Sequence, residues 1–171
     1  MIDRVLIDSL NLKSRDFAVK WKDFIRGAKQ LKNYQAMDDE ALIAEGRHCF
    51  PLLSKTLDRG LDRSLVGNFF VTLGKDRLHG GFPVSEVIYG LNLMQKVVIE
   101  YIMTEFAPDN SMRMYQSLGA LTRISEFFLL GSFYITKGFL EETYTRMSSN
   151  DQVSEEFLKK YFKDDFFFKE R

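Results

Sequence analysis

The sequence has few of the residues that build covalently linked or metal-stabilised folds. Its 171 residues include one cysteine, Cys49, together with two histidines and three prolines. A single cysteine excludes a disulfide within the chain and a zinc site built from several cysteines of one chain. So few prolines leave room for long uninterrupted helices. We therefore expect a cytoplasmic protein that is stabilised by a hydrophobic core.

The chain also lacks an excess of one charge and a long apolar run. Its 24 lysines and arginines balance 24 aspartates and glutamates, so no overall field attracts nucleic acid. The longest uncharged runs, residues 64–74 and 127–136, are shorter than the roughly 18 apolar residues of a membrane span. The first residues lack the cleavage site of a signal peptide. We expect neither a nucleic-acid partner nor a membrane span.

Aromatic residues, by contrast, are abundant: sixteen Phe, seven Tyr and one Trp. Apolar residues recur at intervals of three and four, which predicts amphipathic helices. The fold class expected is all-α, a single-domain bundle of about six helices over residues 1–171. Residues 1–13 form an N-terminal lead, and residues 149–171 form a terminal helix that can connect to an output module. A globin-like arrangement without bound haem is one form that such a bundle can take.

Polar residues and prolines predict the helix ends. Ser14 can cap the first helix, Asp38 or Asp39 can begin the second, and Asp62 can begin the third. Pro51 is expected to bend or split the second helix. The fourth helix runs from residue 83 to about 106 and stops before Pro108. Asp109 or Asn110 can cap a fifth pattern, which runs from 111 to about 147. This pattern is one helix or two joined near Gly131 or Gly138. A last helix over about 154–167 leads into Phe166, Phe167 and Phe168.

The clearest helix-to-helix corner lies at residues 79–83, HGGFP. Gly80 and Gly81 can close one helix through a left-handed residue, and Pro83 suits the first turn of the next. The new helix N-terminus could alternatively bind an anion, with Arg77 and His79 close before it. Glu86 in its first turn opposes an anion, so we favour a structural corner and keep Arg77 and His79 as candidate ligand-binding residues.

Two further charges interrupt apolar helix patterns. Arg123 and Glu126 are three residues apart and can pair on one helix surface. Alternatively, they line a polar cavity for a small ligand, because an isolated buried charge is too costly. They complete the set of candidate ligand-binding residues.

Residues 127–135, FFLLGSFYI, are apolar on nearly every side. Such a helix is buried all round, either as the central helix of one subunit or between the core and a second subunit. The second alternative predicts a homodimer. Its expected interface residues are Phe127, Phe128, Leu130, Phe133 and Tyr134.

Imidazole chemistry has only two candidates, His48 and His79. Each follows an acid by three residues, Glu45 and Asp76, and Glu-x-x-His pairs from two helices hold metal in di-iron bundles. The second pair has aspartate and abuts a helix end, so we expect no metal, no cofactor and no catalytic residues. His48 and Cys49 point about 100° apart on a helix, which is unsuitable for a nucleophile and its base.

Residues 73–101, LGKDRLHGGFPVSEVIYGLNLMQKVVIEY, carry an "LG…R…G.P..EVI…L" pattern. In this pattern the chain resembles the helical N-terminal domain of bacterial RsbRD-type stress-response regulators, co-antagonists of the stressosome pathway. The resemblance covers roughly residues 36–144. It implies an all-helical sensory domain placed ahead of an output module, often a STAS domain that partners a switch kinase, and it supplies no catalytic residues.

The leading hypothesis is a non-enzymatic signalling domain, dimeric, that transmits the binding of a ligand or partner protein to an output module through its terminal helix. One alternative is a globin-like haem or tetrapyrrole sensor, in which either histidine is an axial ligand. A related one is a helical protein that binds an apolar ligand. A small helical enzyme remains a further alternative, for which the two acid-x-x-His pairs are the positive feature.

Overall fold

Helices account for all the regular structure in the computed structural model, which describes residues 2–106 and 111–162. The all-α class is therefore confirmed. Eight helices occur in these residues where about six were expected, because the expected lead is helical and a short helix precedes residue 39. They are α1 (Ile2–Leu12), α2 (Ser14–Gly27), α3 (Lys32–Ala36), α4 (Asp39–Arg59), α5 (Arg63–His79), α6 (Val84–Glu105), α7 (Ser111–Ser148) and α8 (Glu155–Tyr161).

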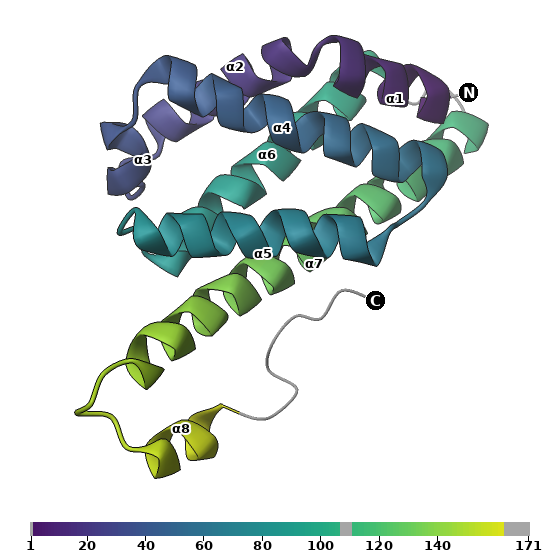
Figure 1. Cartoon of the computed structure of the whole chain (residues 1–171). Coiled ribbons are helices and arrows are strands. Elements are labelled where there is room, and N and C mark those ends of the chain that lie inside the picture. Colours follow the sequence, from purple (N-terminus) through teal and green to yellow (C-terminus); the bar gives the residue numbers. More distant parts are fainter. Residues whose placement is uncertain (1, 107–110, 163–171) are drawn as a thin grey trace.

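The longest helix, α7, runs along one side of the bundle and continues beyond α5 to α8 (Figure 1). Helices α1 and α2 lie along α4, α5 crosses α7 in the most extensive contact of the bundle, and α6 contacts both α2 and α7. Near its C-terminal end α7 carries α8, which packs on it through the buried Leu158 and through the rings of Tyr144 and Phe162, 5.2 Å apart. One helix thus joins the main bundle to the last described element.

Three helix starts are fixed by side-chain caps. Asp38 accepts a hydrogen bond from the Ala41 amide at 2.7 Å and Asp62 accepts one from the Leu65 amide at 3.0 Å. Ser154 caps α8 in the same way. Each oxygen satisfies an amide that has no partner inside its helix.

The expected cap at Ser14 is wrong. Ser14 is the first residue of α2, and Lys13 holds the N-cap position without a side-chain hydrogen bond. The Lys13 amide already bonds the carbonyl of Ser9 in α1 at 2.8 Å. Since α1 leads almost directly into α2 through Lys13, Ser14 lies inside the helix and not in front of it. Leu6 and Leu10 of α1 are fully buried, so the lead is part of the core.

Pro51 does not split its helix, because α4 is continuous from Asp39 to Arg59. The face that it buries against α1 and α2 is the one that the apolar spacing predicts, namely Leu42, Gly46, Cys49, Phe50, Leu53 and Leu57. Gly46 permits this approach, since a Cβ there would lie 2.7 Å from that of Ala18.

Helix α7 is a single helix, so neither Gly131 nor Gly138 is a joint. A Cβ on Gly138 would lie 2.2 Å from the carbonyl oxygen of Val71 in α5, and one on Gly74 would lie 2.4 Å from that of Ile135. These glycines let the backbones of α5 and α7 touch where they cross. The expected signals at Pro108, Asp109, Asn110 and residues 166–168 lie outside the described residues.

By length and composition, α7 could also cross a membrane between Met114 and Ser148. Only 39% of its most apolar window is buried in the bundle. A single helix of this kind is weak evidence for a membrane span, because core helices of soluble proteins can have the same length and composition.

Candidate functional site

The corner between α5 and α6 is built from backbone hydrogen bonds. The Phe82 amide donates to the Arg77 carbonyl at 2.9 Å and the Gly81 amide donates to that of Leu78 at 3.0 Å. This pair of bonds is a Schellman ending. Gly81 has the left-handed φ of +77° that it requires, whereas Gly80 is in an ordinary conformation at −74°. Pro83 is the N-cap of α6. The backbone groups that could have bound a ligand at the end of α5 are thus already used.

Glu86 fills the other half of the same corner. It is buried in the first turn of α6 and accepts hydrogen bonds from the Asn33 amide at 2.9 Å and the Asn33 side chain at 3.0 Å. The carboxylate therefore complements the N-terminus of α6 and fixes α3 to it. An external anion would have to displace this carboxylate.

Arg77 is enclosed within the bundle. It forms an ion pair with Glu45 of α4, and both side chains are less than one-fifth exposed. Its guanidinium lies 4.7 Å from the ring centre of Phe82 and 5.4 Å from that of Tyr34. Such contacts hold a buried cation through the negative ring faces. Arg77 thus joins α3, α4 and the corner.

His79 lies at the surface, where it connects α5 to the last turns of α7. Its Nδ1 is 2.8 Å from Nη2 of Arg146, and its Nε2 is 3.0 Å from Oε1 of Glu142. A guanidinium can only donate. Nδ1 therefore accepts from Arg146, and Nε2 donates to Glu142. Glu142 also pairs with Arg146 at 3.2 Å.

The four candidate ligand-binding residues do not meet in one site. Arg123 and Glu126 are exposed on α7, and Arg123 donates to the Leu57 carbonyl at 3.4 Å. Between Arg123 and Glu142, the partner of His79, the helix rises about 28 Å at 1.5 Å per residue. Arg77 is separated from both groups by its burial. Because Arg123 and Glu126 are exposed, neither is a buried charge that would require a polar cavity.

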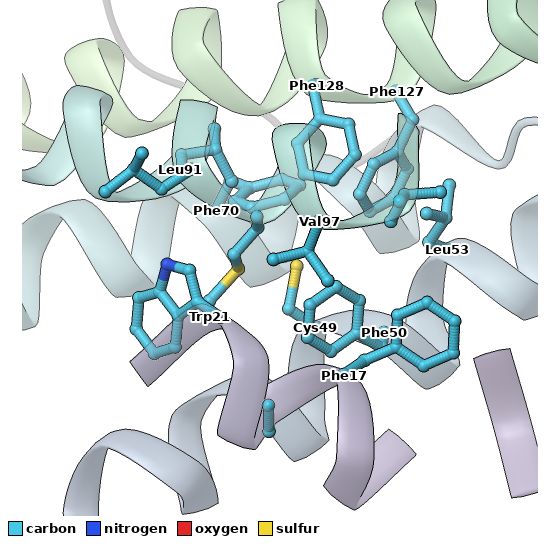
Figure 2. Close-up of a cluster of buried hydrophobic side chains, with 14 of the residues drawn as sticks. Phe17, Trp21, Cys49, Phe50, Leu53, Phe70, Leu91, Val97, Phe127 and Phe128 are labelled. Atoms are coloured by element: carbon cyan, nitrogen blue, oxygen red, sulfur yellow. The ribbon is translucent and has the colours of Figure 1, made fainter. Parts of the chain in front are cut away.

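The expected dimer interface needs a correction. Phe127, Phe128 and Tyr134 are buried within the subunit, because they face α5 and the aromatic core, where the ring centres of Phe127 and Phe70 are 5.4 Å apart (Figure 2). They cannot form an outer surface. Leu130 is partly buried, and only Phe133 of the five is exposed. The segment is thus not buried all round.

The outer side of α7 carries Phe133, which sequence analysis placed at an interface, and other exposed apolar residues that it missed. Leu129 is 71% exposed and Phe133 is 59% exposed. They belong to a line of exposed residues that follow one another at intervals of three, four or seven, which places them on one helix face. The α7 stripe, as we call it, consists of Tyr115, Leu118, Thr122, Leu129, Phe133, Thr136 and Leu140. Testing the whole helix for a second apolar face would have found it.

Two open grooves have apolar side chains in their lining. One, of about 440 Å³, lies between α6 and α7 and is lined by Ile88, Phe133, Lys137 and Leu140 with two hydroxyl residues. The other, of about 450 Å³, lies between α4 and α5. Its lining consists of three apolar residues and five polar or charged ones, namely Leu65, Phe69, Leu73, Glu45, His48, Asn68, Thr72 and Asp76.

The remaining chemical candidates are separated by burial. His48 is exposed, whereas Cys49 is fully enclosed and its burial raises the pKa of its thiol to about 12. Glu45 faces Arg77. Among the described residues no three His, Cys, Asp or Glu side chains lie close enough together to hold a metal ion. Side chains such as Trp21, Phe50, Phe70 and Phe127 fill the interior around Cys49 (Figure 2).

Comparison with known proteins finds no matching family model, no matching curated protein and no matching solved structure. Neither the globin-like arrangement nor the resemblance to the stress-response regulators is therefore tested by them.

Proposed function

We propose that this protein is a non-enzymatic signalling domain that passes the binding of a partner or ligand along α7 to the segment that follows it. The observation that carries the proposal is the double role of α7. Its inner face supplies core residues such as Ile124 and Phe127, while its last turns hold α8. A continuous helix is a stiff connection, so movement at one end reaches the other.

Two further observations support the proposal. The His79, Glu142 and Arg146 cluster ties the end of α5 to α7 close to where α8 packs, so the α5 to α6 corner is joined to the same rod. The resemblance of residues 73–101 to bacterial stress-response input domains favours the same role. In that role the output would be an adjacent module or a partner protein.

Hydrogen exchange of the whole chain tests transmission along α7. We expect Ile124→Ala, in the core at the far end of α7, to speed exchange of the α8 amides. The matched control is Ile25→Ala, an equally buried residue of α2. The two variants are compared at similar global stability. If they speed exchange of the α8 amides equally, or if neither speeds it, α7 does not transmit and the proposal is wrong.

The groove between α4 and α5 favours a second candidate, the binding of an apolar ligand or a flat tetrapyrrole. Its lining combines the apolar residues Leu65, Phe69 and Leu73 with His48. A flat tetrapyrrole needs an apolar surface of this kind and an axial ligand such as histidine. Titration with hemin would shift the Soret band from its position in free hemin, and His48→Ala would abolish this shift. A spectrum unchanged by this substitution rejects the tetrapyrrole.

A further inference from the structure

We propose that the α7 stripe is the contact surface for a second copy of this chain, with the two α7 helices packed antiparallel about a two-fold axis at the level of residues 131 and 132. The proposal concerns the partner of one surface. It holds or fails independently of the signalling role, because it is tested by association and not by transmission.

The first argument is the apolar content of the stripe. Tyr115, Leu118, Leu129, Phe133 and Leu140 expose between 43% and 78% of their surface. They lie on one face of a single rigid helix, and exposed apolar surface of this extent marks an interaction site. The spacing of three and four is that of a seam between two helices.

The second argument is the charge pattern beside the stripe. Glu126 and Lys137 lie on the same flank of α7, and neither makes an ion pair within the described residues. In an antiparallel pair related by a two-fold axis, one flank faces the same flank of the other helix. An axis midway between the two charges therefore brings Glu126 of each copy beside Lys137 of the other, twice over. A parallel pair separates them by the rise of eleven residues, about 16 Å.

This register also matches the apolar residues. With the axis at residues 131 and 132, Leu129 of one copy faces Phe133 of the other, and Thr122 faces Leu140. The groove of about 440 Å³ between α6 and α7 opens beside Phe133 and Leu140, so it can receive side chains from the second copy. Charge and shape thus select the same occupant, which is a copy of this chain.

The association itself is tested by sedimentation of the full chain over a wide concentration range. We expect a dimer in the native protein and a monomer in Phe133→Glu, because the new carboxylate would be buried. The control is Leu12→Glu, which places the same charge on an apolar residue of α1 that is 82% exposed and lies outside the stripe. A native chain that stays monomeric at its solubility limit, or a Leu12→Glu variant that loses the dimer as completely, overturns the proposal.

The register is tested by exchanging the charges. Glu126→Lys alone and Lys137→Glu alone each create two repulsive pairs, so each should weaken the dimer by about tenfold or more. The double variant restores both attractions and should return the dissociation constant to within about threefold of the native value. A double variant as weak as the sum of the single ones rejects this register.

The orientation is tested by a cysteine at Leu140. In the antiparallel dimer the two copies of residue 140 lie on opposite sides of the axis, so Leu140→Cys should form no disulfide between copies. Cys49 is buried and can be left in place. Rapid crosslinking of Leu140→Cys in the dimer would show a parallel pair and overturn the proposal.

Discussion

Arg77 of α5 and Glu45 of α4 form an ion pair that is almost wholly enclosed by the bundle. Burying two charges costs free energy that their attraction and the rings of Tyr34 and Phe82 must offset. The pair therefore specifies how α4, α5 and the corner fit together, and its net contribution to stability is small.

Removing one partner of this ion pair should lower the stability more than removing both. Glu45→Ala leaves the Arg77 guanidinium buried without its carboxylate, and we expect a loss of about 3 to 5 kcal/mol in the free energy of unfolding. The double variant Glu45→Leu with Arg77→Met should lose less than Glu45→Ala alone, because no uncompensated charge remains. Urea unfolding followed by circular dichroism measures both, and a double variant that is the less stable of the two would contradict this account.

Glycine at the α5 to α6 corner should matter at one position and not at its neighbour. Gly81→Val places a branched side chain at a φ of +77°, and we expect a loss of about 1 to 3 kcal/mol. Gly80→Ala is the control, because Gly80 has an ordinary φ of −74° and an added Cβ would come no closer than 3.4 Å to another side chain or backbone atom. Similar unfolding midpoints for the two variants would show that the left-handed residue is unimportant.

The crossing of α5 and α7 should tolerate no added methyl group. Gly138→Ala would place a Cβ 2.2 Å from the Val71 carbonyl oxygen, so the helices must separate, at a cost of about 1 to 3 kcal/mol or more. Gly119→Ala, on the same helix in open space, should instead stabilise the protein by up to about 1 kcal/mol, the helix-propensity gain. Thermal unfolding of both variants compares them directly, and shifts of the same sign would contradict the packing described here.

Tyr34 should make the protein sensitive to alkali. Burial raises the pKa of its hydroxyl from 10.0 to about 12, with the nearby Arg77 opposing the rise. The folded state therefore holds this proton more tightly than the unfolded state. Stability is fully present below about pH 10 and falls as the pH rises from 10 towards 12, by up to roughly 2 to 3 kcal/mol.

The variant Tyr34→Phe keeps the ring and lacks the proton. The pH dependence of its urea midpoint should be flatter than that of the native chain between about pH 10 and 12. Parallel curves would assign the alkaline loss to other groups.

Local signals made the helix ends readable from the sequence. Asp38 and Asp62 cap their helices because a cap needs only the next three residues. The predicted cap at Ser14 is wrong because the capping rule assumes that a helix begins after a non-helical segment. The structure shows that α1 leads almost directly into α2. The predicted joint near Gly138 is wrong for a related reason. A glycine inside a helix pattern indicates either a break or a close approach, and the deciding atom, the Val71 carbonyl oxygen, is 67 residues away in the sequence.

The candidate site was harder to predict for the same physical reason. Arg77 was selected as a candidate ligand-binding residue, but its partner Glu45 lies on another helix, and no spacing rule connects them. The alternation of Phe127 and Phe128 with Leu129 does carry the necessary signal. Residues two apart on a helix do not share a face, so a segment with apolar residues all round can contain one core face and one outer face.

The contact of Gly74 and Gly138 with the opposing backbone makes the crossing of α5 and α7 a fulcrum. Neither helix can slide past the other there without a clash, so a relative movement of α5 and α7 would be a tilt about that point. Its arms are unequal: at 1.5 Å per residue, about 40 Å extend to Ser111 and about 15 Å to Ser148. A tilt of a given angle would therefore displace the Ser111 end of α7 roughly two to three times as far as the Ser148 end.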